Sequence, residues 1–185
     1  MFDARLLAPE TTRALRRTEY DRLVELGAFA NERVELIEGV LVSMSPNNPA
    51  HASPIQVLTE LLVPALVGRA VVRVQLPIIA AGESEPEPDL VIAPLGDYRT
   101  SHPSHAHCVI EVAQSSLSKD RNVKAPLYAA SGFAEYWLVN VPEQVVEVFR
   151  SPESGTYRQR SRHTVGETLS LQLFTDVQIE VARLF

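Results

Sequence analysis

The chain has 185 residues, of which 45% are hydrophobic and 22% charged, an ordinary globular composition that excludes a disordered or coiled-coil protein. Its one cysteine, Cys108, excludes an intramolecular disulfide, and no apolar run approaches the roughly 20 residues of a membrane-spanning helix, so we expect a soluble cytoplasmic protein. The formal net charge of −6 gives no overall attraction to a phosphate backbone and counts against a simple nucleic-acid coat protein.

The first predicted elements are a helix and a hairpin. Residues 18–27 place apolar side chains on one helical face, with Thr18 as the candidate N-cap and Gly27 as the stop. Residues 33–44, RVELIEGVLVSM, predict two short strands around a Glu38-Gly39 turn, because glycine supplies the positive φ of a tight hairpin.

A second helix is expected where SPIQVLTELLVPALVGRA follows the hairpin. Ser53 would be its N-cap and Pro54 its first helical residue, where proline is tolerated. Pro64 should kink or end this helix, because proline removes a backbone donor and clashes with the preceding turn.

The remaining chain alternates strands with one helix. Apolar runs predict strands at 70–80, 89–95, 108–113, 135–140 and 145–150. A helix from about Ser118 to Ser131, closed by Gly132, separates the third strand from the fourth. This order predicts an α/β fold over residues 1–185, a single domain with a central mixed sheet flanked by helices and added strands at about 155–185.

Two acidic residues stand in or beside apolar strands. Glu111 lies in the middle of VIEVA, and a strand covered on both faces would require a cation for it. The alternative is an edge strand with Glu111 in water. Asp89 precedes the apolar run LVIA and follows Pro88, which places it at a strand entrance; alone, it would more simply be a turn aspartate. Together, two such carboxylates form the oxygen site that Mg²⁺ prefers.

The candidate set is completed by a lysine and a further glutamate. Lys119 and Lys124 are the only lysines among 17 basic residues, and Lys124 lies on the predicted helix, where its alternative is a solvent-facing position. An ammonium near metal-bound carboxylates can orient water or stabilise developing charge. Glu35 lies inside a strand, whereas Glu38 precedes the turn glycine, so Glu35 is the preferred further acid.

These residues carry a resemblance to the Uma2 family, formerly a domain of unknown function, within the PD-(D/E)XK nuclease-like superfamily. The stretches that carry it are VELIEGVLVSMSP followed by His51, EPEPDLVIA, VIEVAQSSLSKDRNVKAPLYAASGFAEYWLVN and VVEVFRSPESGTY. They cover most of the chain from Thr18 to Tyr157. The order and spacing of the stretches, more than any one of them, indicate the family.

The resemblance implies a restriction-endonuclease-like core and a metal-dependent endonuclease acting on nucleic acid, DNA first, as a homodimer. Asp89 and Glu111 would bind Mg²⁺ or Mn²⁺, through water to Glu35, and Lys124 would position the attacking water. The superfamily pattern places a lysine two residues after the glutamate, where this chain has Ala113, and Gln114 departs from the family's usual acidic or small polar residue.

Other functional classes remain open or are set aside. A nuclease-like scaffold could serve as a catalytically silent binding or regulatory module, which the net acidity and few clustered basic residues favour, or as a partner-dependent subunit. A zinc site at HPSHAHC lacks a second ligand pair. A serine hydrolase is excluded by the lack of a Gly-x-Ser-x-Gly elbow. Tyr136 and Trp137 occupy opposite strand faces, which favours packing over base stacking.

Overall fold

The computed structural model describes residues 13–46 and 48–185. The predicted domain range begins at residue 1, and its residues 1–12 lie outside the described part. The elements, in chain order, are α1 (Arg17–Glu25), β1 (Val34–Ile37), β2 (Val40–Ser43), α2 (Pro49–Ala65), β3 (Val71–Val74), β4 (Leu90–Ala93), β5 (Cys108–Ala113), α3 (Leu117–Lys119), η3 (Asp120–Lys124), α4 (Ala125–Ala130), β6 (Glu135–Asn140), β7 (Val145–Glu153), β8 (Thr156–Thr164), β9 (Thr168–Ser170), β10 (Gln178–Glu180) and η4 (Val181–Leu184). Among these, no helix is long and apolar enough to cross a membrane.

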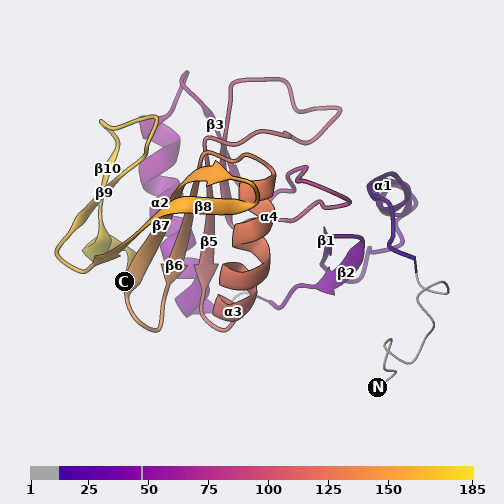
Figure 1. The fold of residues 1–185 in the computed structure, drawn as a ribbon, viewed down its shortest axis with the longest axis horizontal. Helices are drawn as coiled ribbons and strands as arrows, with labels where there is room; N and C mark the ends of the chain where they lie inside the picture. The colour runs from indigo at the N-terminus through magenta and orange to yellow at the C-terminus, as the bar shows by residue number, and fades with distance from the viewer. Residues whose placement is uncertain (1–12, 47) are drawn as a thin grey trace.

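The centre of the fold is a six-stranded mixed sheet in the order β3-β4-β5-β6-β7-β8 (Figure 1). Only β5 and β6 pair in parallel, because the α3–η3–α4 segment crosses between them; the other neighbours are antiparallel. The predicted α/β class with a central mixed sheet flanked by helices is therefore confirmed.

The two faces of this sheet bury different residues. One face packs against α2 and the C-terminal segment, in a core that includes Leu58, Leu62 and Trp137. The other face packs against α4, with Tyr128 and Tyr136 at its centre. Tyr136 and Trp137 thus point to opposite faces, as the strand alternation predicts, and both are fully buried. β9 and β10 form a separate two-stranded antiparallel sheet.

The predicted hairpin is present as β1 and β2, a two-stranded sheet beside the main one. Its turn residues Glu38 and Gly39 both have positive φ, 48° and 77°, as a two-residue turn of the hairpin type requires. A bridge between Leu36 and Glu85 ties the hairpin to the segment before β4. This contact holds β1 beside the segment that leads into β4.

The second helix begins one turn earlier than predicted. Asn48 is the N-cap, with its side chain accepting the His51 N–H at 3.1 Å, and Pro49 is the first helical residue. The expected cap-then-proline pattern is right, but Asn48-Pro49 uses it instead of Ser53-Pro54. Consequently His51 lies in the first turn of α2. The helix ends at Ala65, directly after Pro64.

Two further boundaries differ from prediction. The strand expected over 70–80 stops at Val74, because Gln75 has φ 50° and the chain leaves the pleated conformation there. The first helix is capped at Arg16 instead of Thr18, and the Arg16 N–H donates to Glu19 Oε2 at 2.9 Å. Gly27, with φ 72°, follows its end as predicted.

Candidate active site

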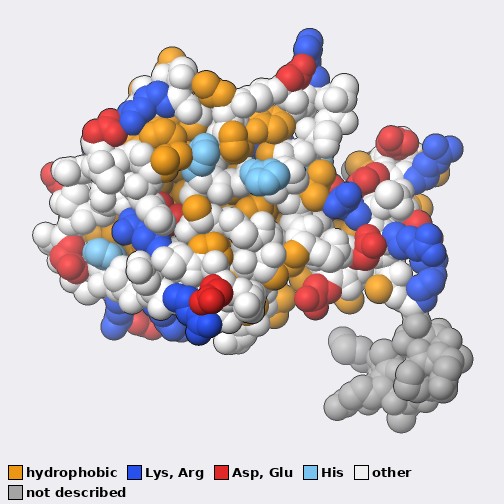
Figure 2. All heavy atoms as spheres, turned by 45° about the horizontal axis from the view of Figure 1, so that its top comes forward, with side chains coloured by type: hydrophobic (Ala, Val, Ile, Leu, Met, Phe, Trp, Pro, Cys, Tyr) orange, Lys and Arg blue, Asp and Glu red, His pale blue; other side chains and the backbone are white. Residues whose placement is uncertain are grey.

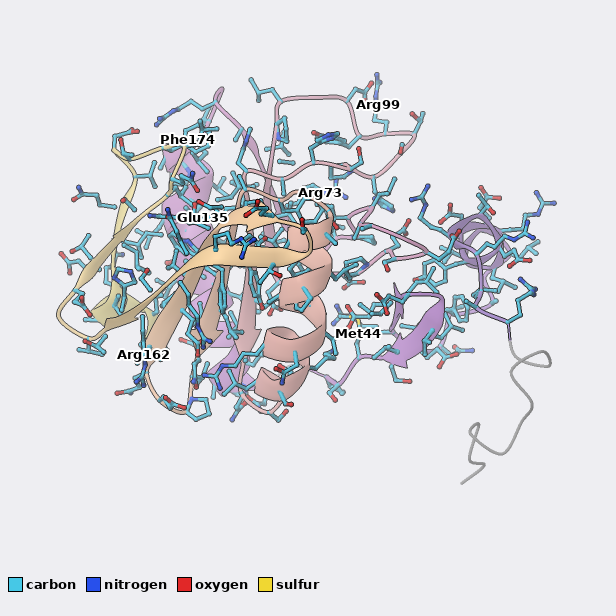
Figure 3. All side chains as sticks on the ribbon, in the orientation of Figure 1. Met44, Arg73, Arg99, Glu135, Arg162 and Phe174 are labelled. Atoms are coloured by element: carbon cyan, nitrogen blue, oxygen red, sulfur yellow. The ribbon has the colours of Figure 1, made fainter. Side chains whose placement is uncertain are left out.

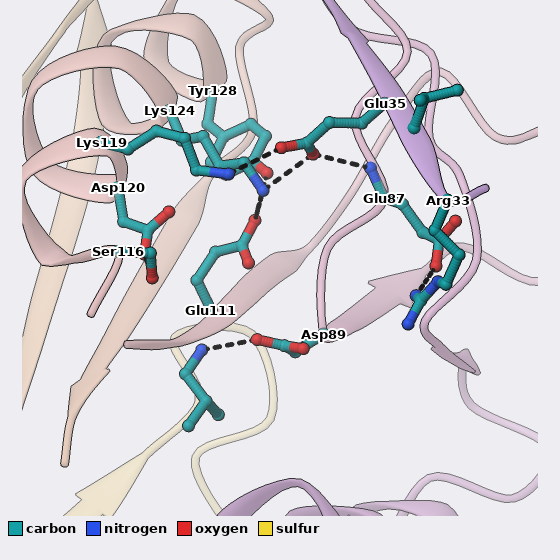
Figure 4. Close-up of polar contacts among 12 residues, drawn as sticks. Arg33, Glu35, Glu87, Asp89, Glu111, Ser116, Lys119, Asp120, Lys124 and Tyr128 are labelled. Atoms are coloured by element: carbon teal, nitrogen blue, oxygen red, sulfur yellow. Dashed lines mark hydrogen bonds and ion pairs between the residues drawn. The ribbon is translucent and has the colours of Figure 1, made fainter. Parts of the chain in front are cut away.

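A hollow of about 150 Å³ opens where the C-terminal end of β5 meets the start of α2, the hairpin and α3. Its charged lining consists of Glu35, Glu87, Asp89, Glu111, Lys119, Asp120 and Lys124, and His51 also borders it. Most of these side chains are buried, so the hollow is a polar pocket within the fold (Figure 4).

Glu111 stands at the centre of the hollow because β5 is an inner strand. It is 5% exposed, which rules out the edge strand in water. Its Oε1 accepts from Lys124 Nζ at 2.8 Å and from the Tyr128 hydroxyl at 2.6 Å. Burial raises the pKa of Glu111 to about 8, with the carboxylates of Asp120, Asp89 and Glu35 adding to the effect and Lys124 opposing it.

Lys124 is buried between two carboxylates. Its Nζ lies 2.8 Å from Glu111 Oε1 and 2.9 Å from Glu35 Oε2, and the residue is 2% exposed. Burial alone would lower the pKa of Lys124, but Glu111, Glu35 and Asp120 raise it above its ordinary value. The solvent-facing alternative for this lysine is therefore wrong.

Glu35 contacts both lysines of the chain. Lys119 Nζ donates to its Oε1 at 2.9 Å, Lys124 reaches its Oε2, and the Glu87 N–H also donates to Oε2 at 3.3 Å. Burial would raise the pKa of Glu35, but the two ammonium groups lower it below its ordinary value. Glu38, the competing candidate, is exposed, so the hairpin sends only Glu35 into the pocket.

A π-helical turn brings the two lysines together. The predicted helix over 118–131 is present, but Asp120–Lys124 forms i→i+5 bonds in place of regular α-helical ones. On an α-helix, residues five apart such as Lys119 and Lys124 point about 140° away from each other. The wider turn stacks them on one side, where both reach Glu35. Such π turns are common at functional sites.

Asp89 lies at the entrance of β4, one residue before Leu90, which pairs with Ile110 of β5. Its Oδ2 accepts the Val112 N–H at 2.8 Å, and His51 Nε2 is 3.4 Å from the same oxygen. The contact between the His51 imidazole and the Asp89 carboxylate raises the pKa of His51 above its ordinary value. Asp89 is 8% exposed, so it is a buried acid beside Glu111's strand and not a turn residue in water.

The pocket carries more negative than positive charge. Four of its carboxylates, Glu35, Asp89, Glu111 and Asp120, face two ammonium groups, and Glu87 has its own partner in Arg33. With all four carboxylates ionised and His51 neutral, the set has two excess negative charges. Buried carboxylates require protons or cations, so a divalent ion matches this donor set in charge and in ligand type.

The donor set would leave most of a metal's ligands to water and substrate. Among the described residues no three His, Cys, Asp or Glu side chains converge on one point. Mg²⁺ is commonly held by one or two carboxylates, with waters and phosphate oxygens completing its shell. Asp89 and Glu111 suit that arrangement.

The sequence that forms this pocket matches a known protein family. The sequence model of Uma2, described as "Putative restriction endonuclease", matches residues 17–182. The chain belongs to the Uma2 family. The match spans nearly the whole chain, including all the charged pocket residues, and the membership associates this Uma2 protein with a nuclease family.

A solved structure supports the fold of this Uma2 chain. It is similar, with a TM-score of 0.69 and 16% sequence identity, to a crystal structure described as "a putative nuclease belonging to DUF820" from Anabaena variabilis ATCC 29413. The alignment covers 92% of this chain and 97% of the other. At this identity the likeness concerns the fold. A search of curated proteins returned no match.

Some pocket residues of this Uma2 protein are absent from the predicted set. Lys119 is one of only two lysines in the chain, and this rarity is the sequence signal that could have identified it. Tyr128 lies four residues after Lys124, a spacing visible in the sequence, and His51 appears in the motif that carries the family resemblance. Asp120 lies four residues before Lys124, a spacing that is also visible in the sequence. Its burial and the hydroxyl donated by Ser116 come from tertiary structure.

The histidine-rich loop has different contacts. His102 Nδ1 lies 3.1 Å from an Arg73 guanidinium nitrogen, His105 contacts Ser104, and His107 packs edge-on against Phe174. In the part of the chain that is described, these side chains do not gather around a common point. They are distributed over three separate environments.

Proposed function

We propose that this Uma2 protein is a metal-dependent endonuclease that hydrolyses phosphodiester bonds in DNA. The observation that carries the proposal is the buried charge imbalance of the pocket, four carboxylates against two lysines, with Asp89 at the entrance of β4 and Glu111 in the adjacent β5. A divalent ion would neutralise it, and membership of a nuclease family supplies the reaction class.

Asp89 and Glu111 are the residues that would hold Mg²⁺ or Mn²⁺. When bound, such an ion lowers the pKa of a water ligand and polarises a phosphoryl oxygen. Asp89 is prepared for this by the Val112 N–H and His51, which both engage Oδ2. Glu111 is prepared by Lys124 and Tyr128, which both engage Oε1. In each case one oxygen is oriented by the protein, which fixes the carboxylate plane.

Lys124 would position water and stabilise charge. An ammonium group has three donors, and two are directed at Glu35 and Glu111. The third can reach a water molecule or phosphate oxygen in the hollow. Glu35 would act through the lysines as a positioning residue, because both its oxygens accept from them. Lys124 thereby takes the place that the superfamily lysine would have at Ala113.

The first test is cleavage. Plasmid, single-stranded DNA and RNA would be incubated with Mg²⁺ or Mn²⁺ and the protein, beside Asp89→Asn and Lys124→Met. Asp97→Asn, an exposed aspartate paired with Arg99, is the matched control. We expect DNA cleavage by the parent and the control only. Cleavage that persists in both pocket variants would contradict the assigned site, and cleavage of no substrate would favour the silent binding module.

A second test measures the metal without catalysis. Ligand that binds only the folded state at 100 times its Kd adds about 2.7 kcal/mol of stability, so Mg²⁺ or Mn²⁺ should raise the melting temperature. Asp89→Asn and Glu111→Gln should abolish this rise, whereas Asp97→Asn should keep it. An equal rise in all variants would place the ion elsewhere.

The remaining parts of the proposal are a homodimer, from the family resemblance, and action in the reducing cytoplasm, from the single buried Cys108. Sedimentation of the parent with and without DNA tests the dimer. A monomer under both conditions would exclude it.

A further inference from the structure

The exposed edge of the main sheet carries a row of arginines. β8 has one paired neighbour, β7, and its sequence TYRQRSRHT places arginines at alternate positions, Arg158, Arg160 and Arg162. Alternate residues of a strand share a face. This basic row exists although the net charge of the whole chain is −6. On the face shown in Figure 2, acidic and basic side chains are interspersed.

The register connects this row to the pocket. Glu111 pairs with Leu138, Leu138 with Glu147, and Glu147 with Arg162, across the strands from β5 to β8. Directly paired residues point to the same face of a sheet, so Arg162 lies on the face of Glu111. Three strand spacings of about 4.8 Å place it roughly 14 Å away.

A further arginine bridges the interval. Arg121 follows Lys119 and Asp120 on the same helical segment, and its Nε donates to Glu147 Oε1 at 3.0 Å. Arg160 contacts Glu147 from the other side and lies over the Phe149 ring, 5.0 Å from its centroid. We call Arg121, Arg158, Arg160 and Arg162 the arginine strip. It begins at the helix that lines the pocket and runs along β8.

The outer members of the strip have weakly held partners. Arg158 pairs with Glu153 and Arg162 with Glu143, and all four side chains are about half exposed or more. Exposed ion pairs of this kind contribute little to stability, because water and salt screen them. Their guanidinium groups can therefore turn to another anion at small cost. Arg121 and Arg160 differ, since they share the buried Glu147.

We propose that the arginine strip binds the phosphate backbone of the nucleic-acid strand whose cleavage we assign to the pocket. This rests on the proposed function and deepens it. Alternate strand residues are about 6.8 Å apart, so the arginines of β8 form a regular row of positive charge along which a phosphate backbone can lie. Planar guanidinium groups suit phosphate oxygens. The nucleic-acid strand would thus lie along β8 on one side of the α3–η3–α4 segment, and the pocket lies on the other side of that segment.

The test uses binding in EDTA, where no strand is cut. A short fluorescein-labelled duplex, its single strand and the RNA equivalent would be titrated with protein at several salt concentrations. Each lost phosphate contact lowers the slope of log K against log salt by about 0.9 on duplex and 0.7 on single strands. The double variant R158Q/R162Q should therefore lose about 1.8 or 1.4, and the arms identify which nucleic acid is bound.

Two matched variants separate binding from a structural role. E143Q/E153Q removes the carboxylates paired with Arg162 and Arg158 and leaves both arginines in place, so it should strengthen binding several-fold at low salt. E143Q/E153Q and R158Q/R162Q break the same two ion pairs, so a purely structural effect would be the same in both variants. R69Q/R99Q removes two arginines that are also paired with exposed aspartates and should bind like the parent. Figure 3 shows Arg99 at the top of the molecule and Arg162 at the lower left.

Each outcome decides the proposal. An unchanged slope in R158Q/R162Q, or a parent that binds none of the three probes, overturns it. If the parent cuts DNA while R158Q/R162Q binds normally, only the strip is refuted. If the strip variants alter binding as expected but no substrate is cut, the strip stands and the nuclease proposal fails.

Discussion

Replacing Lys124 with methionine should lower the free energy of unfolding by about 3 to 5 kcal/mol at neutral pH, as expected when one partner of a buried ion pair is removed. Methionine retains most of the volume but leaves Glu35 and Glu111, which are 0% and 5% exposed, without this cation. Glu35 keeps its bond from Lys119. Most of the cost therefore falls on Glu111.

The assay is urea unfolding followed by the fluorescence of Trp137, the only tryptophan of the chain. Lys119→Met is the control, because it removes the same residue type 2.9 Å from the same glutamate. Its side chain is 35% exposed, so water screens this ammonium and the loss should be smaller than that of Lys124→Met. The difference in burial between the two lysine side chains should therefore make the loss of stability larger for Lys124→Met than for Lys119→Met.

A second variant isolates the uncompensated charge. Glu111→Gln introduced into Lys124→Met removes the carboxylate that the missing ammonium neutralised, so the double variant should recover part of the loss. The loss should also shrink as the pH is lowered through and below 4.5, the ordinary glutamate pKa, because Glu111 then becomes protonated in the unfolded state as well as in the folded state. A Lys124→Met loss that is no larger than that of Lys119→Met, and constant with pH, would refute the reasoning.

Two further predictions concern other parts of the chain. Burial and the nearby Asp21 carboxylate raise the pKa of Glu85 to about 7 from 4.5. Below 4.5 this carboxyl is protonated in both states, and its cost to the folded state grows to roughly 3 kcal/mol as the pH rises from 4.5 to 7. Urea unfolding across this pH range should show Glu85→Gln gaining stability relative to the parent, and parallel curves would contradict the shift. Gly39→Ala would place a Cβ 2.5 Å from Ala14 Cβ at φ 77°, whereas Gly68→Ala at φ 71° meets open space. Thermal unfolding should show a loss of about 1 kcal/mol for Gly68→Ala and 1 to 3 kcal/mol more for Gly39→Ala; equal losses would mean that Ala14 moves aside.

The sequence alone determined the class of fold and most of its strands. Apolar runs bounded by glycine, proline and acidic residues predict β5 and β6 at their observed bounds, because buried strands produce a strong local signal. The same logic identified Glu111 and Asp89, since a carboxylate next to an apolar run is conspicuous. A local pattern was less able to decide where α2 begins, because Asn48-Pro49 and Ser53-Pro54 present the same start signal.

Only the tertiary structure decided how the acidic residues and lysines are paired. Glu35 is 84 residues from Lys119, and no periodicity within either segment reveals that the hairpin delivers it to both lysines. The π turn that aligns Lys119 with Lys124 departs from the helical period on which sequence reasoning relies. Strand register likewise placed Arg162 in the row of Glu111. Residue types and burial patterns can be recognised within a short segment, whereas the charge balance of a site depends on which distant segments share one buried space.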